Sequence, residues 1–282
     1  MDWPQPRGSQ IRGSVLFLSG RGDFIEKYLE PLGYWHDRGW NVAAFDWRSQ
    51  GQSQGDIEGG HLDSFEPLVV DGADLIADWI ATTPGPHVAV GHSMGGHLLL
   101  RILGEARPPL AAAVLVAPMI GINSLPMPAG ISQAIAQTLC MFGWNEVPAW
   151  KQSRKPPPAG SVRQSFLTSC SERYSDELWW LERQPDFALG APSWGWLNAA
   201  YASMAKLTPE RLRKIDLPIF ILGAERDRLV RASAIRAAAA ALPRAELMML
   251  PDAAHEILRE SDALRVPAMQ RIDAFFDEHA AA

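Results

Sequence analysis

The feature that most restricts the fold is an alternation of short apolar segments with longer helical ones. Six apolar segments are predicted strands: 15–19, 41–46, 87–90, 111–118, 217–223 and 247–250. Helical patterns lie between or after them, at 65–81, 97–103, 232–242 and 262–276, with a further helix around 28–34. Near-continuous apolar strands alternating with helices are typical of a parallel sheet buried on both faces. The pattern therefore predicts an α/β fold with a mostly parallel central sheet and helices on both faces.

Residues 119–205 interrupt this alternation. The segment is rich in Pro, Gly, Ser and Trp, carries helical pieces and contains no convincing strand. Six tryptophans are concentrated there: Trp144, Trp150, Trp179, Trp180, Trp194 and Trp196. We interpret residues 119–205 as a helical cap inserted into a core that is formed by residues 1–118 and 206–282.

A glycine-flanked serine follows one of the predicted strands. Residues 88–100 read VAVGHSMGGHLLL, so Ser93 lies in a sharp turn between a strand and a helix. Gly91 and Gly95 stand two residues to either side, where a larger side chain would collide with the neighbouring strand or helix. Such a G-x-S-x-G turn exposes a nucleophilic hydroxyl at a helix N-terminus, whose free N–H groups stabilise a developing anion. The alternative is an ordinary glycine-rich turn, so the assignment depends on partners elsewhere in the chain.

A catalytic serine needs a base, and the base needs an acid that orients it. In an open parallel sheet, both are expected after strand carboxyl ends, on the same edge as the serine. Asp227 follows the predicted strand 217–223, and His255 follows the strand 247–250, where we expect it to begin the last helix. The chain order Ser93, Asp227, His255 is that of the α/β-hydrolases. We predict that Ser93 attacks a carbonyl, His255 transfers the proton and Asp227 fixes the imidazole.

Other residues compete for the acid and base roles. Glu225 and Asp252 are rival acids, and a salt bridge with Arg226 or Arg228 is the alternative for Asp227. Other histidines are interpreted as surface residues (His36, His61 and His279) or as packing and hydrogen-bonding residues beside the serine turn (His92 and His97).

Acyl transfer also needs two preorganised N–H donors for the oxyanion. One is expected from Met94, the residue after Ser93, and the other from Arg21 in the loop SGRGD that follows the first strand. Gly20 and Gly22 flank Arg21 and let the backbone approach a substrate. The alternative reading of this loop is a simple glycine turn.

Composition excludes several other classes of protein. The chain has 282 residues and a net charge of −6, so it lacks the basic surface of a nucleic-acid-binding protein. Its two cysteines, Cys140 and Cys170, give no disulfide framework and no metal-ligand spacing, which fits a reducing cytosol. We expect no signal peptide and no transmembrane helix, because no apolar run suits either. We predict no metal, no cofactor and a cytoplasmic location.

Five segments together resemble the monoacylglycerol lipase and lysophospholipase group of α/β-hydrolases, the serine aminopeptidase-like hydrolases. They are VLFLSGRGDFIEKY, FDWRSQGQSQG, GHSMGG, ILGAERDRLV and AAHEILRESDALRVPAMQRIDAFF. The last segment is similar to bacterial lysophospholipase L2-type sequences. The resemblance implies an α/β-hydrolase fold with a helical cap, a triad of Ser93, Asp227 and His255, and oxyanion donors at Arg21 and Met94.

We therefore predict a serine carboxylester hydrolase that cleaves monoacyl lipids, either lysophospholipids or monoacylglycerols, through an acyl-enzyme. The alternatives are an esterase or acyltransferase for smaller acyl substrates and a non-catalytic binding protein on the same scaffold. Two departures from the family pattern leave the triad intact. Ser19 stands where many members have histidine, and the loop 46–53 has lost one glycine.

The apolar residues of the cap are predicted either to line a pocket for the acyl chain or to attach the cap to the core. They are the tryptophans named above together with Met127, Met141, Phe142 and Met204. Contact between the cap and the inner membrane surface is a further expectation, because tryptophan prefers the membrane interface. The basic residues Lys151, Arg154 and Lys155 would assist this contact.

Overall fold

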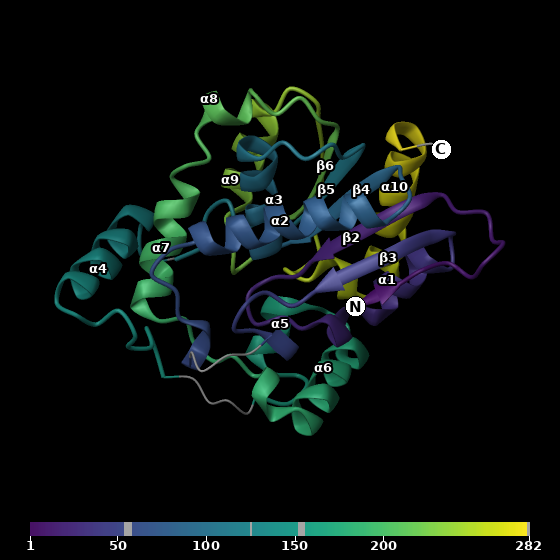
Figure 1. Cartoon of the computed structure of the whole chain (residues 1–282). Coiled ribbons are helices and arrows are strands. Elements are labelled where there is room, and N and C mark those ends of the chain that lie inside the picture. The colour runs from purple at the N-terminus through teal and green to yellow at the C-terminus, as the bar shows by residue number, and fades with distance from the viewer. Residues whose placement is uncertain (54–57, 125, 152–155, 281–282) are drawn as a thin grey trace.

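One mostly parallel sheet organises the computed structural model, which describes residues 1–53, 58–124, 126–151 and 156–280. In these residues seven strands follow the order β1-β3-β2-β4-β5-β6-β7 (Figure 1). Their bounds are β1 Asp2–Trp3, β2 Gly13–Leu18, β3 Trp40–Phe45, β4 His87–His92, β5 Ala112–Val116, β6 Ile219–Ala224 and β7 Ala245–Leu250. Only β1 pairs in the antiparallel sense, with β3. The predicted sheet is confirmed, and the two-residue β1 is too short to show any periodicity in sequence.

The inner strands are buried on both faces, as their apolar sequences predict. Every residue of β2, β5 and β6 is buried, whereas the edge strand β7 is only partly covered. β4 is longer than predicted and runs to His92, so that Ser93 follows the strand directly. The serine is thereby fixed at the carboxyl edge of the sheet.

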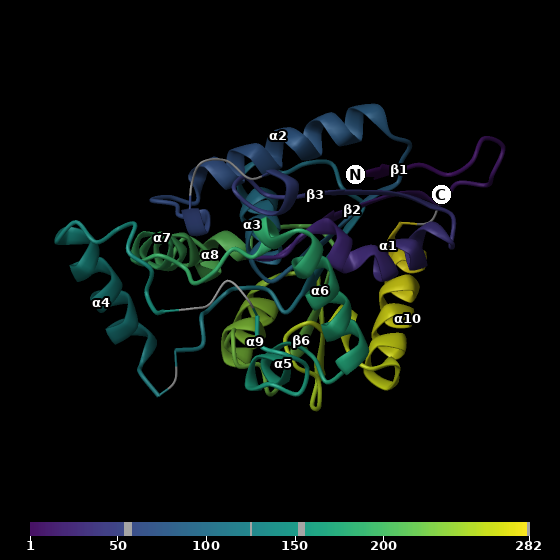
Figure 2. The same cartoon turned by 90° about the horizontal axis from the view of Figure 1, so that it is seen from below.

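Helices cover both faces of the sheet. α2 (Glu66–Thr82) packs against α3 (Met94–Glu105), where Gly72 leaves room for Ile102. α1 (Leu29–His36) lies beside α10 (Asp262–His279), and the Tyr34 hydroxyl donates to Asp273 at 2.9 Å. Figure 2 shows α2 on one side of β2 and β3, with α1 and α10 on the other. α9 (Ala232–Ala241) packs against β6 and β7.

The chain between β5 and β6 is helical. It contains α4 (Ala129–Met141), α5 (Val162–Leu167), α6 (Ser171–Arg183), the 3-10 turn η4 (Pro185–Phe187), α7 (Trp194–Met204) and α8 (Pro209–Leu212). The described residues of this segment hold no strand, only two isolated bridges, between Ile122 and Val230 and between Pro148 and Ser193. The cap boundaries at 119 and 205 stay a prediction.

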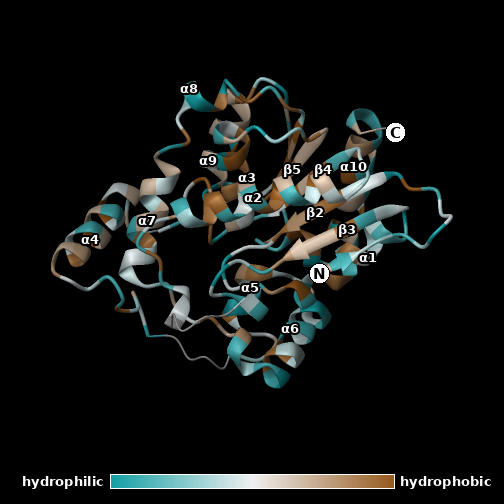
Figure 3. Ribbon diagram, viewed as in Figure 1, coloured by the Kyte–Doolittle hydropathy of each residue, from teal (hydrophilic) through white to brown (hydrophobic). Residues whose placement is uncertain are grey.

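Two of these helices attach to the core in different ways. α7 meets α3 through Ser203, whose Oγ lies 2.7 Å from His97 Nε2 and accepts a hydrogen bond from Arg101, also at 2.7 Å. α6 and η4 contact the core through a small apolar cluster. In it, Leu181 of α6 and Phe187 of η4 join Phe24, the residue before the 3-10 turn η1 (Ile25–Tyr28). Figure 3 shows the hydrophobic residues concentrated in the strands and the hydrophilic ones on the outer faces of the helices.

The start of the last helix differs from the prediction. His255 lies in a loop, a short 3-10 turn η5 (Ile257–Arg259) follows, and α10 begins only at Asp262. Glu260 holds this loop by accepting hydrogen bonds from the backbone of Ala254 at 2.6 Å and Ser169 at 2.9 Å. The expectation that His255 begins the last helix was therefore wrong.

Three further 3-10 turns complete the element list: η1 (Ile25–Tyr28) before α1, η2 (Gly51–Ser53) and η3 (Glu58–Gly60). Among the described helices, none combines the length and the apolar character needed to cross a bilayer.

Candidate active site

Ser93 has a backbone conformation that L-residues rarely adopt. Its φ is 51° and its ψ is −114°, at the junction of β4 and α3. A Cβ on Gly91 would lie 2.7 Å from the Cα of Gly96, and one on Gly95 would lie 2.2 Å from the carbonyl oxygen of Leu18. Both glycines are required for the close approach of the turn to α3 and β2. Such strain persists only where the surrounding packing enforces it, as it commonly does at functional sites.

Three residues predicted from chain order meet at this edge of the sheet. His255 Nε2 lies 2.9 Å from Ser93 Oγ, and His255 Nδ1 lies 2.7 Å from Asp227 Oδ2. His255 and Asp227 are buried. With this geometry, one imidazole nitrogen can accept the hydroxyl proton while the other donates to the carboxylate.

The carboxylate of Asp227 is held as a hydrogen-bond acceptor. Its Oδ1 accepts from the backbone N–H of Leu229 at 2.7 Å and of Val230 at 2.9 Å. Burial by itself raises the pKa of Asp227, but the charge and hydrogen bond of His255 and the two N–H donors lower it below its ordinary value. The group is therefore ionised at neutral pH.

The rival acids have other partners. Glu225 pairs with Arg236, and the Asp252 carboxylate lies 3.5 Å from Arg226. Asp227 is turned toward the imidazole of His255 instead.

Residues at the end of α5 hold the loop that carries His255. The N–H of His255 donates to the carbonyl of Phe166 at 3.3 Å, and the N–H of Glu256 donates to that of Leu167 at 2.8 Å. The segment between β5 and β6 therefore takes part in positioning the histidine.

Charges around His255 favour its protonated form. Burial lowers the pKa of His255, but Asp227, with smaller contributions from Glu256 and Asp23, raises it above the ordinary value of 6.5. A raised pKa suits a base that must hold a proton between two chemical steps.

The loop after β2 is pinned on both sides of Arg21. The N–H of Gly20 donates to Asp23 Oδ2 at 2.9 Å, and the N–H of Gly22 donates to Gln50 Oε1. The orientation of the peptide groups on either side of Arg21 is therefore fixed.

The backbone N–H groups of Arg21 and Met94 lie beside the serine, and neither has an acceptor within the described residues. Met94 is the first residue of α3, so the helix does not use its N–H. A Cβ on Gly20 would lie 3.1 Å from the Cβ of Ser93, so the loop passes directly beside the serine. These two groups are the donors that the sequence predicts for an oxyanion hole.

A buried charge cluster, missed in the sequence, lies behind this loop. Lys27 Nζ lies 2.8 Å from Asp23, 2.6 Å from Glu256 and 3.3 Å from Glu177 of α6. Arg259 adds contacts of 2.7 Å to Glu256 and 3.4 Å to Glu177. We call these five residues the Lys27 cluster; all of them are buried. The cluster joins η1, α6 and the loop of His255.

Opposite charges compensate burial throughout the Lys27 cluster. Burial lowers the pKa of Lys27, but the surrounding carboxylates raise it above its ordinary value. Burial raises the pKa of Glu256, but Lys27 and Arg259 lower it to about 2. Asp23, whose Oδ2 accepts from the Tyr28 hydroxyl at 2.9 Å, likewise has its pKa lowered despite burial. These groups stay charged at neutral pH.

The structure tests the predictions made for several histidines and cap residues. His61 is not a free surface residue, because its Nδ1 lies 2.7 Å from Ser193 Oγ. His92 and His97 are hydrogen-bonded packing residues, as predicted; His92 Nδ1 lies 3.1 Å from Asp23. Met204 and Trp196 pack on the core, which is the alternative predicted for them.

Other cap residues face outward. Met141 and Phe142, at the end of α4, keep 81% and 76% of their surface exposed, and Met127, Trp144 and Trp150 are also exposed. Their side chains are exposed to solvent and are not packed in the core. Arg154 and Lys155 lie outside the described residues.

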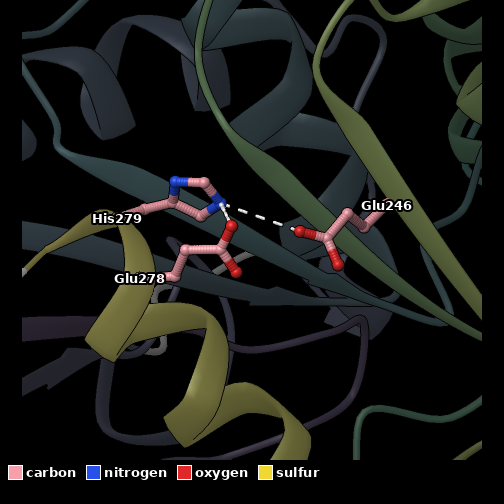
Figure 4. Close-up of side chains that lie close together, drawn as sticks. All are labelled: Glu246, Glu278 and His279. Carbon is pink, nitrogen blue, oxygen red and sulfur yellow. Dashed lines mark ion pairs between the residues drawn. The ribbon is translucent and has the colours of Figure 1, made fainter.

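One group of described side chains brings together three potential metal ligands: Glu246, Glu278 and His279 (Figure 4). Glu246 lies near the start of β7, at the opposite edge of the sheet from Ser93, and it already pairs with Arg271. This group belongs to the packing of α10 on β7. A cavity of about 780 Å³ lies between α1 and α6. Ser93 is not among the residues that line it.

Comparison with known proteins adds a family and a fold. Residues 9–262 match the model of the serine aminopeptidase S33 family. A probable lysophospholipase L2 of Haemophilus influenzae is 27% identical over 275 residues, covering 95% of this chain and 85% of that protein. Lysophospholipase L2 of Escherichia coli K12 is 28% identical over 286 residues, covering 94% and 80%.

Solved structures support the α/β-hydrolase fold predicted from the sequence. A soluble variant of monoglyceride lipase from Saccharomyces cerevisiae has a TM-score of 0.76 at 21% identity, covering 100% of this chain and 92% of that one. Monoacylglycerol lipase of Paleococcus ferrophilus has a TM-score of 0.73 at 19% identity, covering 99% and 98%.

Proposed function

Because the chain belongs to the serine aminopeptidase S33 family of hydrolases, we propose that it is a serine hydrolase that cleaves the ester of monoacyl lipids. The hydrogen-bonded series Asp227–His255–Ser93, with distances of 2.7 and 2.9 Å, carries this proposal. Relatives named lysophospholipase L2 and a fold shared with monoglyceride lipases support lysophospholipids or monoacylglycerols as substrates.

Each residue has one role in the proposed reaction. The hydroxyl oxygen of Ser93 attacks the ester carbonyl while its proton passes to Nε2 of His255. The N–H groups of Arg21 and Met94 donate to the oxyanion of the tetrahedral intermediate. Asp227 accepts the N–H at Nδ1 of His255 and stabilises the imidazolium that forms.

The two leaving steps complete the cycle. Collapse of the first intermediate breaks the bond to the glycerol oxygen, which takes the proton from His255 and leaves an acyl-Ser93 ester. Water then attacks this ester and gives a proton to His255. Collapse of the second intermediate returns the proton to Ser93 and releases the fatty acid.

We also propose that the cap contacts the cytoplasmic surface of the inner membrane, where such lipids reside. The apolar surface of α4 and of the chain on either side of it supports this contact: Met127, Ile131, Met141, Phe142, Trp144 and Trp150 are exposed there, and Lys151 follows Trp150 in the chain. Co-sedimentation with vesicles of phosphatidylethanolamine and phosphatidylglycerol tests it. Phe142→Ser should weaken binding, while Val162→Ser, an exposed apolar site on α5, should not.

Two assays test the catalytic proposal. A fluorophosphonate should label the wild-type protein and should not label Ser93→Ala. The wild type should then hydrolyse 1-oleoylglycerol or oleoyl lysophosphatidylethanolamine, and His255→Ala should lose about 10³-fold or more in kcat. Hydrolysis of a short ester alone, with neither lipid cleaved, would refute the lipid substrate.

A further inference from the structure

Beside the candidate nucleophile, the side chain of Arg21 is a cation that pairs with no anion among the described residues. Its Nη1 donates to the carbonyl of Gly190 at 3.0 Å and its Nη2 to that of Gly59 at 2.9 Å. The guanidinium carbon lies 5.0 Å from the ring centroid of Trp196. Among the ion pairs of the described residues, no carboxylate pairs with Arg21.

One nitrogen of this guanidinium makes no hydrogen bond. The Nε atom of Arg21 is buried and has no hydrogen-bond partner. Burial lowers the pKa of Arg21 to about 9, because desolvation disfavours the charged guanidinium. An anion that reached the guanidinium would offset that cost and accept the free N–H.

The position of Arg21 relates such an anion to the reaction. Arg21 follows Gly20, whose Cβ, if it had one, would lie 3.1 Å from the Cβ of Ser93. The backbone N–H of the same residue is the proposed donor to the oxyanion. The Cα of Arg21, from which its side chain extends, therefore lies close to the reacting ester. In a lysophospholipid, the glycerol backbone separates that ester from the phosphate. An arginine side chain is long enough to span this separation.

We propose that the Arg21 guanidinium binds the phosphate group of a lysophospholipid and thereby favours this substrate over a monoacylglycerol. The planar fork of arginine matches phosphate oxygens in geometry and charge. This inference rests on the proposed function and narrows its substrate. The group that Arg21 would bind is a phosphate anion. A lysophospholipid head group and free inorganic phosphate both supply this anion, so inorganic phosphate is the minimal form of the ligand.

A purely structural role predicts a different outcome. Gly190 and Trp196 lie in the segment between β5 and β6, so the guanidinium could act only as a tie between that segment and the core. Loss of a tie would impair the hydrolysis of both lipids alike. Loss of a phosphate ligand would impair one lipid more than the other.

The experiment measures kcat/KM for oleoyl lysophosphatidylethanolamine and for 1-oleoylglycerol, which share one acyl chain. Arg21→Met keeps the backbone N–H, so a change in the ratio of the two values reports on the side chain. We expect the ratio of lysophospholipid to monoacylglycerol to fall about 10- to 100-fold, as for loss of a charged hydrogen bond. Arg21→Lys, which keeps the charge without the fork, should give an intermediate ratio.

Arg48→Met is the matched control. Arg48 lies on the neighbouring loop and pairs with Asp71, so its loss removes one positive charge near the site without removing an unpaired cation. Its ratio should equal that of the wild type. An unchanged ratio in Arg21→Met, with both lipids cleaved by the wild type, would overturn the inference and leave the proposed function intact.

A binding measurement separates the two proposals further. Calorimetry with glycerophosphoethanolamine, the deacylated head group, and with inorganic phosphate should show binding to the wild type and loss of binding in Arg21→Met. Binding of the head group alone would identify a lipid site, and equal binding of phosphate would identify a general phosphate site. If the wild type cleaves neither lipid, the proposed function fails, while these titrations still decide whether Arg21 binds phosphate. No binding of either probe to the wild type would overturn the inference.

Discussion

Two cations close together in the chain, Lys27 and Arg21, have opposite electrostatic settings: Lys27 is buried, and Arg21 is partly buried with its Nε atom enclosed. Lys27 has three carboxylates within 3.3 Å, from Asp23, Glu177 and Glu256. Arg21 has two backbone carbonyls and the ring of Trp196, and no carboxylate among the described residues. Burial lowers the pKa of both groups, but only the pKa of Lys27 is raised again by its neighbours.

This difference separates a structural charge from one available to a ligand. A buried charge that is fully paired fixes the elements that supply its partners, and removing one member leaves the others uncompensated. A buried charge without a counter-charge lowers stability and gains from an anion that arrives with the substrate. The Lys27 cluster should therefore respond to mutation mainly in stability, and Arg21 mainly in substrate preference.

The largest expected effect is on the stability of Lys27→Met. Removal of the ammonium leaves three buried carboxylates with Arg259 as their remaining cation in the cluster, so the free energy of unfolding should fall by about 3–5 kcal/mol. Urea unfolding monitored by tryptophan fluorescence measures it. Lys206→Met is the control, because the Lys206 side chain is 42% exposed in its pair with Glu66, and its loss should cost less than about 1 kcal/mol. Equal, small losses in both variants would contradict the distinction.

The Lys27 cluster was invisible in sequence for a physical reason. The serine turn follows from residues that are adjacent in the chain, so G-x-S-x-G and the strand before Ser93 sufficed to predict it. The cluster instead joins Asp23 and Lys27 to Glu177 and to Glu256, which lie far away in sequence. Only the spacings of Asp23 to Lys27 and of Glu256 to Arg259 gave a local hint, and such pairs are common on solvated helix faces.

The position of His255 shows the same limit. Chain order predicted which histidine meets Ser93 and Asp227, because carboxyl ends of parallel strands share one edge. The predicted local structure around His255 was wrong. The loop depends on hydrogen bonds to the carbonyls of Phe166 and Leu167, which lie in a distant segment of the chain. Helix-favouring residues after His255 gave no sign of this contact.

The second effect is the acid sensitivity conferred by Glu256. Its pKa falls from 4.5 to about 2 on folding, so its contribution to stability is complete above 4.5 and is lost as the pH falls through 2. The size is roughly 3 kcal/mol. The stability difference between wild type and Glu256→Gln should therefore shrink by about this amount between about pH 5 and about pH 2. A difference that does not depend on pH would show that Glu256 is not held as a carboxylate by Lys27.

The third effect links the Lys27 cluster to catalysis. The pKa of His255 is raised above 6.5, so kcat/KM should fall in acid with a midpoint above that value. Glu256 is one of the charges that raise it, so Glu256→Gln should move the midpoint to lower pH by less than about one unit. Glu225→Gln, whose carboxylate pairs with Arg236, should leave the midpoint unchanged. An unmoved midpoint in Glu256→Gln would restrict the cluster to a structural role.

The smallest effect is expected where Arg21 is replaced without a ligand present. Arg21→Met loses two hydrogen bonds to carbonyls and also removes a partly buried charge that has no carboxylate partner among the described residues, so the two consequences oppose each other. The free energy of unfolding should change by less than about 1 kcal/mol. Added glycerophosphoethanolamine should stabilise the wild type, because a ligand that binds only the folded state raises the free energy of unfolding, and should not stabilise the variant. A loss of about 3–5 kcal/mol in Arg21→Met would instead group Arg21 with Lys27 as a structural cation, since that is the cost of breaking a buried charge network.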